Sequence, residues 1–410
     1  MKTKYRIKLN YLFLIFIFVW QSLRLTVLDG FDGKSRLSIF LAFVIFTLNI
    51  LSSRKFGKSL YRNRSILRFS FFWLIYAMIN SIFQYDSASA PILTFLGQSL
   101  FVPFVVMSII SNLPKVEIKK ILFYMQNILY VSFLIILAFV DEVNGRLVLD
   151  RMNVNELSLV VLLLVAVLSL RFVRNDLDNI DFFLLLALPT YYIMFAGSRM
   201  AFGGFAILIT GIFISFKEQE RSGVKLLLKY FVILIIMLSV SYYTLEQTIL
   251  GERLLGTTEQ VESSTNKKYN PAEGTFFEAF GDRGVYYILS WELFIDHPWW
   301  GIGLKNFINY WPTVNHVELM IHFSELGIPG VIFYSIFNFL IIKTIFKRIR
   351  RKNIKENSEL KYILFIWGAI FFSALVLFLY NSIAVGAMYG LILLYLDTND
   401  RKRQIINVRN

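Results

Sequence analysis

The chain has 410 residues, of which 56% are hydrophobic and 41 are Phe, and its formal net charge is +14. This composition excludes an ordinary soluble globular protein and indicates a multi-pass membrane protein. The sequence has no Cys, which excludes disulfides and thiolate catalysis, and its 3 His residues offer little for a metal site, so we expect neither a metal nor a cofactor.

Twelve apolar runs separated by polar connections predict an all-α, polytopic membrane protein, since one bilayer crossing needs about 20 apolar residues. The predicted spans are residues 9–28, 37–51, 66–83, 92–110, 121–140, 154–170, 182–196, 200–216, 226–245, 328–346, 362–380 and 383–396. The first span follows a basic stretch, but no small-residue cleavage site comes after it. We therefore interpret it as a retained helix and not as a signal peptide.

Alternate connections between these spans are strongly basic. The basic runs lie in residues 2–8, 54–68 and 343–355, and in the tail at 401–409. By the positive-inside rule these segments face the cytoplasm, which places both termini inside and requires an even number of spans, about 12. We prefer this topological interpretation to nucleic-acid binding, because the charges form a rim beside the spans, and no nucleic acid is expected as a partner.

The predicted topology divides the chain into four parts. Residues 1–245 hold nine spans, residues 246–326 form one large extracytoplasmic loop with amphipathic helices, residues 327–396 hold three spans, and residues 397–410 form a basic cytoplasmic tail. Long ordered loops are usually functional, so we expect function to concentrate in this loop. Within it, Tyr287, Trp291 and Phe294 follow helical spacing and predict an amphipathic helix at the membrane interface.

An arginine stands between two of the apolar runs, at Arg199 in Gly197-Ser198-Arg199. The two runs together are too long for one crossing, so the chain must turn before Arg199, which then opens a helix with Ser198 as its N-cap. A helix N-terminus and a guanidinium together suit a phosphate group. The alternative is an arginine that reaches lipid headgroups. The small residues at 203, 204 and 206 favour the anion site, because they let neighbouring helices close over it.

Three short motifs lie in the predicted loop. They are DRG at residues 282–284, DHPWWGIG at 296–303, and an ending that runs from NH at 315–316 to ELGIPG at 325–330. With the Ser-Arg pair at a span start and about a dozen spans, this arrangement resembles the O-antigen polymerase and O-antigen ligase superfamily. The motifs are confined to residues 197–200 and 283–330, whereas the similarity in architecture covers much of the chain.

The family's loop ends in a His-Asn pair followed by Glu-x-Gly. His316 matches the His, and Glu325 and Gly327 are in register with the Glu-x-Gly. Val317 replaces the family's Asn, although Asn315 precedes the His, so we carry over only the role of the His. The turn at residues 297–303 matches the family's His-Pro-x-x-Gly-x-Gly, and we interpret it as structural, because Pro and Gly favour a chain reversal.

The resemblance implies a glycosyltransferase that acts on polyprenyl-diphosphate-linked oligosaccharides at the outer face of the membrane. Arg199 and Arg283 are the expected ligands of the departing diphosphate, since a guanidinium binds phosphate through paired hydrogen bonds. His316 is the expected general base, because a neutral imidazole accepts a proton from an attacking hydroxyl group. A single direct displacement would invert the anomeric carbon. Further candidates are Arg253 as a diphosphate ligand and, at lower rank, Arg146, Arg151 and Glu325.

Each of these assignments has a structural alternative. Arg283 could pair locally with Asp282 or Glu278, and His316 could cap a helix. His322 lies off the helical face of His316, so we expect it to pack. The aromatic residues of the loop are expected to anchor it at the membrane interface and not to hold sugars.

The resemblance leaves more than one function open. We favour a polymerase that builds an O-antigen or capsule over a ligase that transfers glycan to lipid A core, because polymerases accompany both kinds of polysaccharide. A lipid-linked oligosaccharide flippase would need charges along a central cavity and repeated halves, and a non-catalytic scaffold would not need Arg199. The expected location is the cytoplasmic (inner) membrane. The expected partners are lipid-linked oligosaccharides, the bilayer, a chain-length regulator and a flippase.

Overall fold

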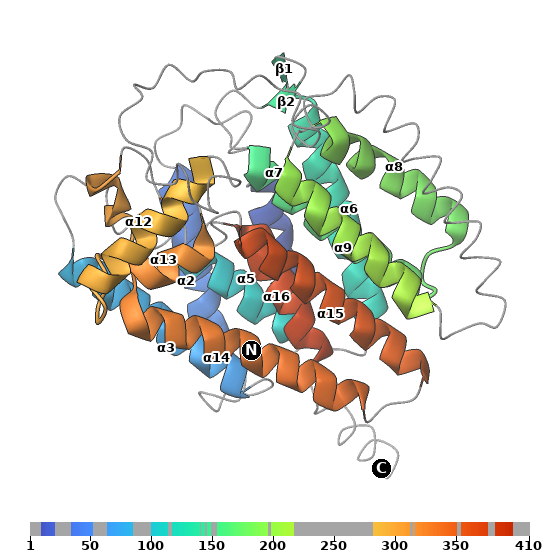
Figure 1. The fold of residues 1–410 in the computed structure, drawn as a ribbon. Coiled ribbons are helices and arrows are strands. Elements are labelled where there is room, and N and C mark those ends of the chain that lie inside the picture. Colours follow the sequence, from blue (N-terminus) through green and yellow to red (C-terminus); the bar gives the residue numbers. More distant parts are fainter. Residues whose placement is uncertain are drawn as a thin grey trace, which may run out of the picture.

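The computed structural model is almost entirely helical over the residues that it describes (Figure 1). The described residues are 10–20, 34–51, 64–84, 100–113, 117–139, 141–143, 146–148, 154–195, 198–216, 282–311, 315, 317–350, 354–375 and 382–396.

The helices follow the apolar runs of the sequence. After a first helix, Asn10–Trp20, they are α2 (Lys34–Leu51), α3 (Arg64–Phe83), α5 (Val102–Ser111), α6 (Ile118–Leu137), α7 (Val154–Val173), α8 (Asn179–Phe195), α9 (Arg199–Phe216), α12 (Asp282–Asp296), the 3-10 helix η4 (Asn306–Asn309), α13 (Glu318–Ser324), α14 (Gly327–Ile349), α15 (Ile354–Ala374) and α16 (Ile383–Tyr395).

Three of the described helices are long and apolar enough to cross a membrane, namely Ile66–Phe83, Ile118–Leu137 and Gly327–Ile349. Every other predicted span overlaps a shorter or less apolar helix, apart from residues 226–245, which lie outside the described residues. The chain is thus a membrane protein with several apolar helices, and the number of about 12 spans stays a prediction.

Two details differ from the all-α prediction. Strands β1 (Asp141–Val143) and β2 (Arg146–Val148) form an antiparallel hairpin between α6 and α7. Asn-Gly at residues 144–145 is a strong local signal for such a turn, and the apolar periodicity on either side of it concealed the strands. Helix α5 begins at Val102, ten residues into the span predicted at 92–110, with Pro103 in its first turn. Proline favours a helix start because its nitrogen has no hydrogen to leave unpaired.

Small residues allow the closest helix contacts in the bundle. A Cβ atom on Gly203 of α9 would lie 2.2 Å from the Phe372 ring of α15, and one on Gly204 would lie 2.9 Å from Leu162 of α7. Of the three small residues in the prediction, Gly203 and Gly204 do let α15 and α7 approach α9, whereas Ala206 is exposed, and the anion site itself stays a prediction. Helices α5 and α16, near the middle of the bundle in Figure 1, meet in the same way, at Gly386 and Gly390.

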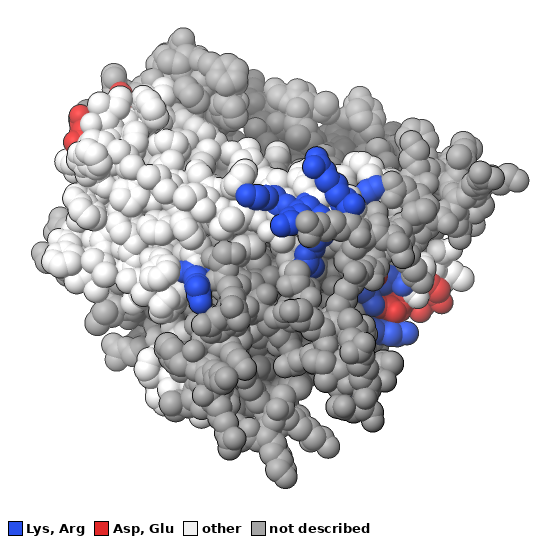
Figure 2. Space-filling view, turned by 90° about the horizontal axis from the view of Figure 1, so that it is seen from below, with Lys and Arg blue, Asp and Glu red and all other residues white. Residues whose placement is uncertain are grey.

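Ion pairs and one hydrogen bond join four helices at one end of the bundle, which we call the basic end. Arg174, just after α7, contacts Glu359 of α15 at 2.7 Å and the Tyr395 hydroxyl group of α16 at 3.3 Å. Lys119 of α6 lies 3.6 Å from Asp176. Figure 2 views the molecule from below and shows a group of Lys and Arg side chains near the middle of this lower face. By the positive-inside rule, we expect the basic end to face the cytoplasm.

Candidate functional site

The opposite end of the bundle, where α3 ends and α14 begins, carries the predicted loop motifs; we call it the loop end. The turn after α12 pairs with the start of α14 through backbone hydrogen bonds. The nitrogen of Ile302 donates to the Ser324 carbonyl and that of Gly303 to the Glu325 carbonyl, both at 2.9 Å, and the Ile328 nitrogen donates to the Pro298 carbonyl at 2.7 Å. The motif at residues 296–303 and the ending at residues 325–330 are therefore the two sides of one backbone junction.

Glycines are required at this junction. Gly301 has φ of +67°, and a Cβ atom there would lie 2.4 Å from the Glu325 carbonyl carbon. Gly327, on the other side, has φ of +63° and would meet the Pro298 carbonyl oxygen at 2.7 Å. Only glycine adopts such a backbone readily and also leaves room for this approach. The structural interpretation of the turn is confirmed.

Glu325 is buried within this junction. Its Oε2 accepts a hydrogen bond from the Lys305 backbone nitrogen at 2.7 Å. Burial raises the pKa of the Glu325 carboxyl group to about 8, and burial also lowers the pKa of the Lys305 amine. The carboxyl group of this lower-ranked candidate thus holds the turn to the start of α14.

Helix α3 supports the junction from a distant part of the sequence. The Tyr76 hydroxyl group donates to the Leu326 carbonyl, and the Asn80 amide donates to the Trp300 carbonyl, both at 2.6 Å. Sequence reasoning missed both residues. Asn80 carried a usable signal, because a polar residue near the end of an apolar span usually has a specific partner.

The residues on either side of His316 are fixed. The Asn315 amide donates to the Ser290 hydroxyl group of α12 at 2.8 Å, and its oxygen accepts from the Val317 nitrogen at 2.9 Å. Both Asn315 and Val317 are buried. Asn315 therefore ties this segment to α12, and His316 itself lies outside the described residues.

The backbone at the predicted diphosphate site follows expectation. Helix α9 begins at Arg199, and the Ser198 hydroxyl oxygen accepts a hydrogen bond from the Ala201 nitrogen at 3.3 Å. Ser198 is thus the N-cap, as predicted. Arg283 stands in the first turn of α12. The structure describes the backbone of both arginines but not their side chains.

Helix α15 connects the starts of α9 and α12. One turn into α12, the Tyr287 hydroxyl group donates to the Leu375 carbonyl, just after α15, at 2.6 Å. Phe372, three residues earlier, packs against Gly203, one turn into α9. The helices that begin at or beside Arg199 and Arg283 therefore start at the same end of the bundle.

The structure describes only the backbone of one further arginine candidate. Arg146 lies in β2, at the end of the hairpin's short loop, and its side chain is not described. Arg253 and Arg151 lie outside the described residues.

His322 is buried in packing contacts, as expected. Its ring centroid lies 4.2 Å from that of Tyr334 and 5.9 Å from that of Trp73. Burial lowers the pKa of His322 to about 3, so the ring stays neutral at physiological pH. The side chain is 1% exposed and cannot reach a substrate hydroxyl group without rearrangement.

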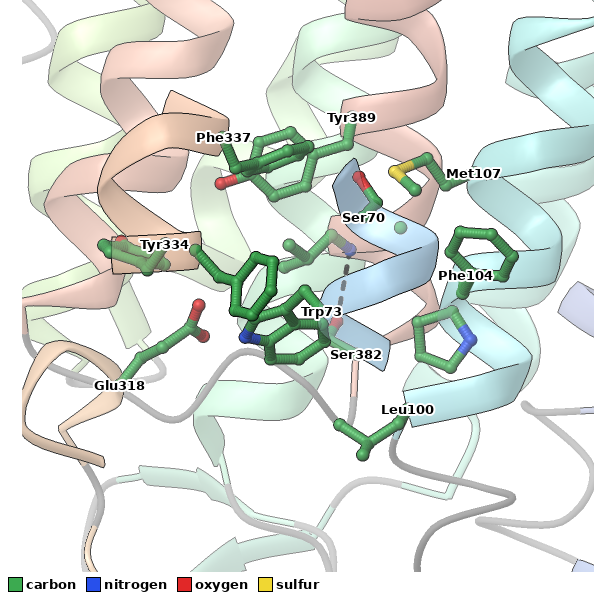
Figure 3. A pocket seen from close by; sticks show the side chains of 14 residues that line it. Ser70, Trp73, Leu100, Phe104, Met107, Glu318, Tyr334, Phe337, Ser382 and Tyr389 are labelled. Atoms are coloured by element: carbon green, nitrogen blue, oxygen red, sulfur yellow. Dashed lines mark hydrogen bonds between the residues drawn. The ribbon is translucent and has the colours of Figure 1, made fainter. Parts of the chain in front are cut away.

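Sequence reasoning also missed Glu318, two residues beyond His316. Its side chain is 4% exposed and lines a partly open cavity of about 100 Å³ between α3, α5, α13, α14 and α16 (Figure 3). An acidic residue in an otherwise apolar stretch beside a span was the available signal.

Helix α12 has the predicted amphipathic character. Tyr286 and Leu293 are buried in a small core with Phe307, whereas Trp291 is 52% exposed. Trp299 and Trp300 of the following turn are also exposed. The position of these aromatic residues at a membrane interface stays a prediction.

In the part of the chain that the structure describes, no group of three or more His, Asp and Glu side chains could hold a metal ion.

Comparison with known proteins adds one result. Residues 182–335 match the sequence model of the family described as O-antigen ligase, a range that runs from α8 through the loop end into α14. The resemblance to the O-antigen polymerase and ligase superfamily is confirmed over this range. No curated protein matches the chain.

Proposed function

We propose that this relative of the O-antigen ligase family, matched over residues 182–335, joins polyprenyl-diphosphate-linked oligosaccharide repeat units into a surface polysaccharide at the outer face of the membrane. The observation that carries the proposal is the extent of the match, which includes Arg199, Arg283 and His316. The common end of the bundle at which α9 and α12 start supports it, since both arginines lie in the first turns of those helices.

In the proposed reaction, Arg199 and Arg283 bind the diphosphate of the donor, with Arg253 as a third ligand. A guanidinium offers paired donors that match phosphate oxygens, and two helix N-termini add partial positive charge. Both effects stabilise the negative charge that grows on the leaving diphosphate. Such a site needs no metal ion to neutralise the leaving group.

His316 is proposed to accept the proton of the acceptor sugar hydroxyl group. The hydroxyl oxygen forms a bond to the anomeric carbon of the donor as the bond from that carbon to the diphosphate oxygen breaks. The lipid diphosphate leaves, and the configuration at the anomeric carbon inverts. The buried contacts of Asn315 and Val317 hold the chain on both sides of the proposed base.

Polymerase and ligase share this donor chemistry and differ only in the acceptor. The family description names a ligase, which keeps transfer to lipid A core as the second candidate. A reconstitution distinguishes them. The purified chain in vesicles with lipid-linked repeat units alone should produce a ladder of longer lipid-linked glycans.

Products that form only after lipid A core is added would identify a ligase. Movement of lipid-linked glycan across the vesicle membrane without any new glycosidic bond would identify a flippase and contradict the proposal. If the ladder forms, adding a chain-length regulator should narrow its length distribution.

A further inference from the structure

Helix α14 presents an exposed apolar face to its surroundings. Only 22% of its apolar span is buried, against 39% and 44% for the other two helices that are long and apolar enough to cross a membrane. Ile332, Phe339 and Phe346 are all exposed, and each follows the one before by seven residues. Residues seven apart lie on nearly the same side of a helix, so these side chains form one apolar stripe along α14.

The same side of the helix becomes cationic toward the basic end. Lys343, Lys347 and Arg350 are exposed, and the first two lie four and eight residues beyond Phe339. The Lys343 amine lies 5.6 Å from the centroid of the Phe339 ring. The apolar stripe and these three cations therefore form one continuous surface, which we call the outer stripe of α14.

The three cations of the outer stripe form no ion pair with an acidic side chain of the described residues. The ion pairs in that part of the chain all involve Arg174 or Asp176, away from α14. Arg348, in the same turn of α14, is buried and donates to the Tyr395 carbonyl at 2.7 Å. Figure 2 shows Lys and Arg side chains, but no described Asp or Glu, near the middle of the lower face. The charge of the outer stripe is therefore available to an anion from outside the chain.

We propose that the outer stripe of α14 binds an anionic phospholipid. The headgroup phosphate contacts Lys343, Lys347 and Arg350. The acyl chains lie along Ile332 and Phe339. A phospholipid presents a charged headgroup and apolar chains in the same order as the stripe presents cations and apolar side chains, and Lys and Arg beside a span attract anionic headgroups. The site lies at the basic end, away from the loop end, and stands whether or not the proposed transfer is correct.

Two other anions fit the outer stripe less well. Inorganic phosphate would contact the cations but would leave the apolar part uncovered. An acidic protein segment would approach from water, whereas the Lys343 amine lies over an aromatic ring of a helix that is apolar enough to cross a membrane. A long lysine side chain at that depth reaches toward the headgroup layer of the bilayer. The occupant that covers both parts of the stripe is a lipid.

A lipid bound at this site would also hold α14 at one depth in the bilayer. The helix runs from Gly327, in the backbone junction of the loop end, to Ile349 beside the cations. At 1.5 Å per residue this is a rigid connection of about 35 Å. The headgroup contacts at one end therefore set the height of the junction at the other.

The test uses the full chain, purified in an uncharged detergent, and native mass spectrometry of the lipids that it retains. Phosphatidylglycerol and phosphatidylcholine with identical acyl chains are the probes, because they differ in the net charge of the headgroup. Each cation is expected to contribute about fivefold, so the wild-type protein should bind phosphatidylglycerol about a hundredfold more tightly. Equal affinities for the two lipids would overturn the proposal without any variant.

Two variants and a matched control locate the site. The triple variant Lys343→Gln, Lys347→Gln, Arg350→Gln should lose the preference for phosphatidylglycerol, and Lys347→Gln alone should weaken its binding about fivefold. Lys119→Gln is the control, since Lys119 is also an exposed lysine of the basic end but is already paired with Asp176. It should bind like the wild type. Wild-type preference in the folded triple variant, or unchanged binding in Lys347→Gln if the triple variant does not fold, would refute the assignment.

Competition distinguishes the lipid from the other two anions. Inorganic phosphate and polyglutamate, each added at the concentration of the lipid, should leave bound phosphatidylglycerol in place. Displacement by inorganic phosphate would show a site for free phosphate. Displacement by polyglutamate would show a docking surface for an acidic protein segment, and either result would contradict the proposal.

Discussion

At the scale of single residues, two arginines are predicted to carry the diphosphate. Arg199→Ala or Arg283→Ala should abolish chain extension while the protein remains folded in the membrane. Lysine at either position should rescue poorly, because a point charge does not reproduce the paired contacts of a guanidinium. The product ladder, measured beside protein abundance in the membrane, checks this. A full polymer length distribution in both alanine variants would eliminate the two-arginine clamp.

The proposed base is a second prediction at this scale. General base catalysis contributes about 10²–10⁴-fold, so His316→Ala should slow transfer by about that range and leave donor binding intact. Turnover and donor affinity in the reconstituted system measure the two effects separately. His297→Ala is the control and should matter less to the chemical step. If His316→Ala keeps wild-type turnover, the base must be reassigned.

The shifted pKa values of Glu325 and His322 predict that the stability of the folded protein depends on pH. The folded pKa of Glu325 is raised from 4.5 to about 8, so the unfolded chain loses its proton first and stability falls as pH rises between these values. The folded pKa of His322 is lowered from 6.5 to about 3, so stability falls as pH drops below 6.5. The two effects oppose each other from pH 4.5 to 6.5. Above pH 6.5 only the effect of Glu325 remains, so the folded protein loses stability from pH 6.5 to about 8.

That loss is on the order of 2 kcal/mol at most, since one pKa unit corresponds to about 1.4 kcal/mol. Thermal unfolding midpoints of the wild-type protein should therefore decline from pH 6.5 to about 8. Glu325→Gln removes the ionisable group but keeps an oxygen that can accept from the Lys305 nitrogen. Its midpoint should be flat over this window, and a slope equal to that of the wild type would contradict the assignment.

At the scale of elements, the contact between α9 and α15 depends on glycines. A Cβ atom on Gly211 would lie 2.6 Å from Cβ of Phe365, whereas one on Gly368 would meet Ile207 at an ordinary 3.5 Å. Gly211→Ala should therefore lower the thermal unfolding midpoint, with an overpacking cost of about 1–3 kcal/mol. Gly368→Ala, on the facing helix, is the matched control and should be neutral or slightly stabilising. Equal midpoints would show that the helices separate easily.

At the scale of the whole molecule, the prediction is the orientation in the membrane. The sequence has no Cys, so single cysteines can be introduced without other changes. Trp299→Cys at the loop end should react with an impermeant thiol reagent in intact cells, and Lys347→Cys near the end of α14 should react only after permeabilisation. Accessibility tags within residues 257–270 should register outside, and tags within 55–64 or after 401 inside. The reverse pattern would place the proposed active site in the cytoplasm.

The sequence by itself determined the features that depend on neighbouring residues. Apolar runs predicted the helices, Ser198 predicted the cap of α9, and the glycines after Pro298 predicted a turn. The β1–β2 hairpin also had a local signal in its Asn-Gly pair, which the apolar periodicity on either side concealed. Each of these follows from backbone preferences within a few residues.

The tertiary structure alone decided which distant residues meet. Asn80 bonds to Trp300 across 220 positions, and Tyr287 bonds to the end of α15 across 88. The same is true of the cavity around Glu318, whose walls come from five helices. Apolar periodicity shows that a helix has a buried face but not which helix covers it, because nearly every face in this chain is apolar. Only packing selects the partners, through close contacts at glycines and hydrogen bonds between groups that cannot reach water.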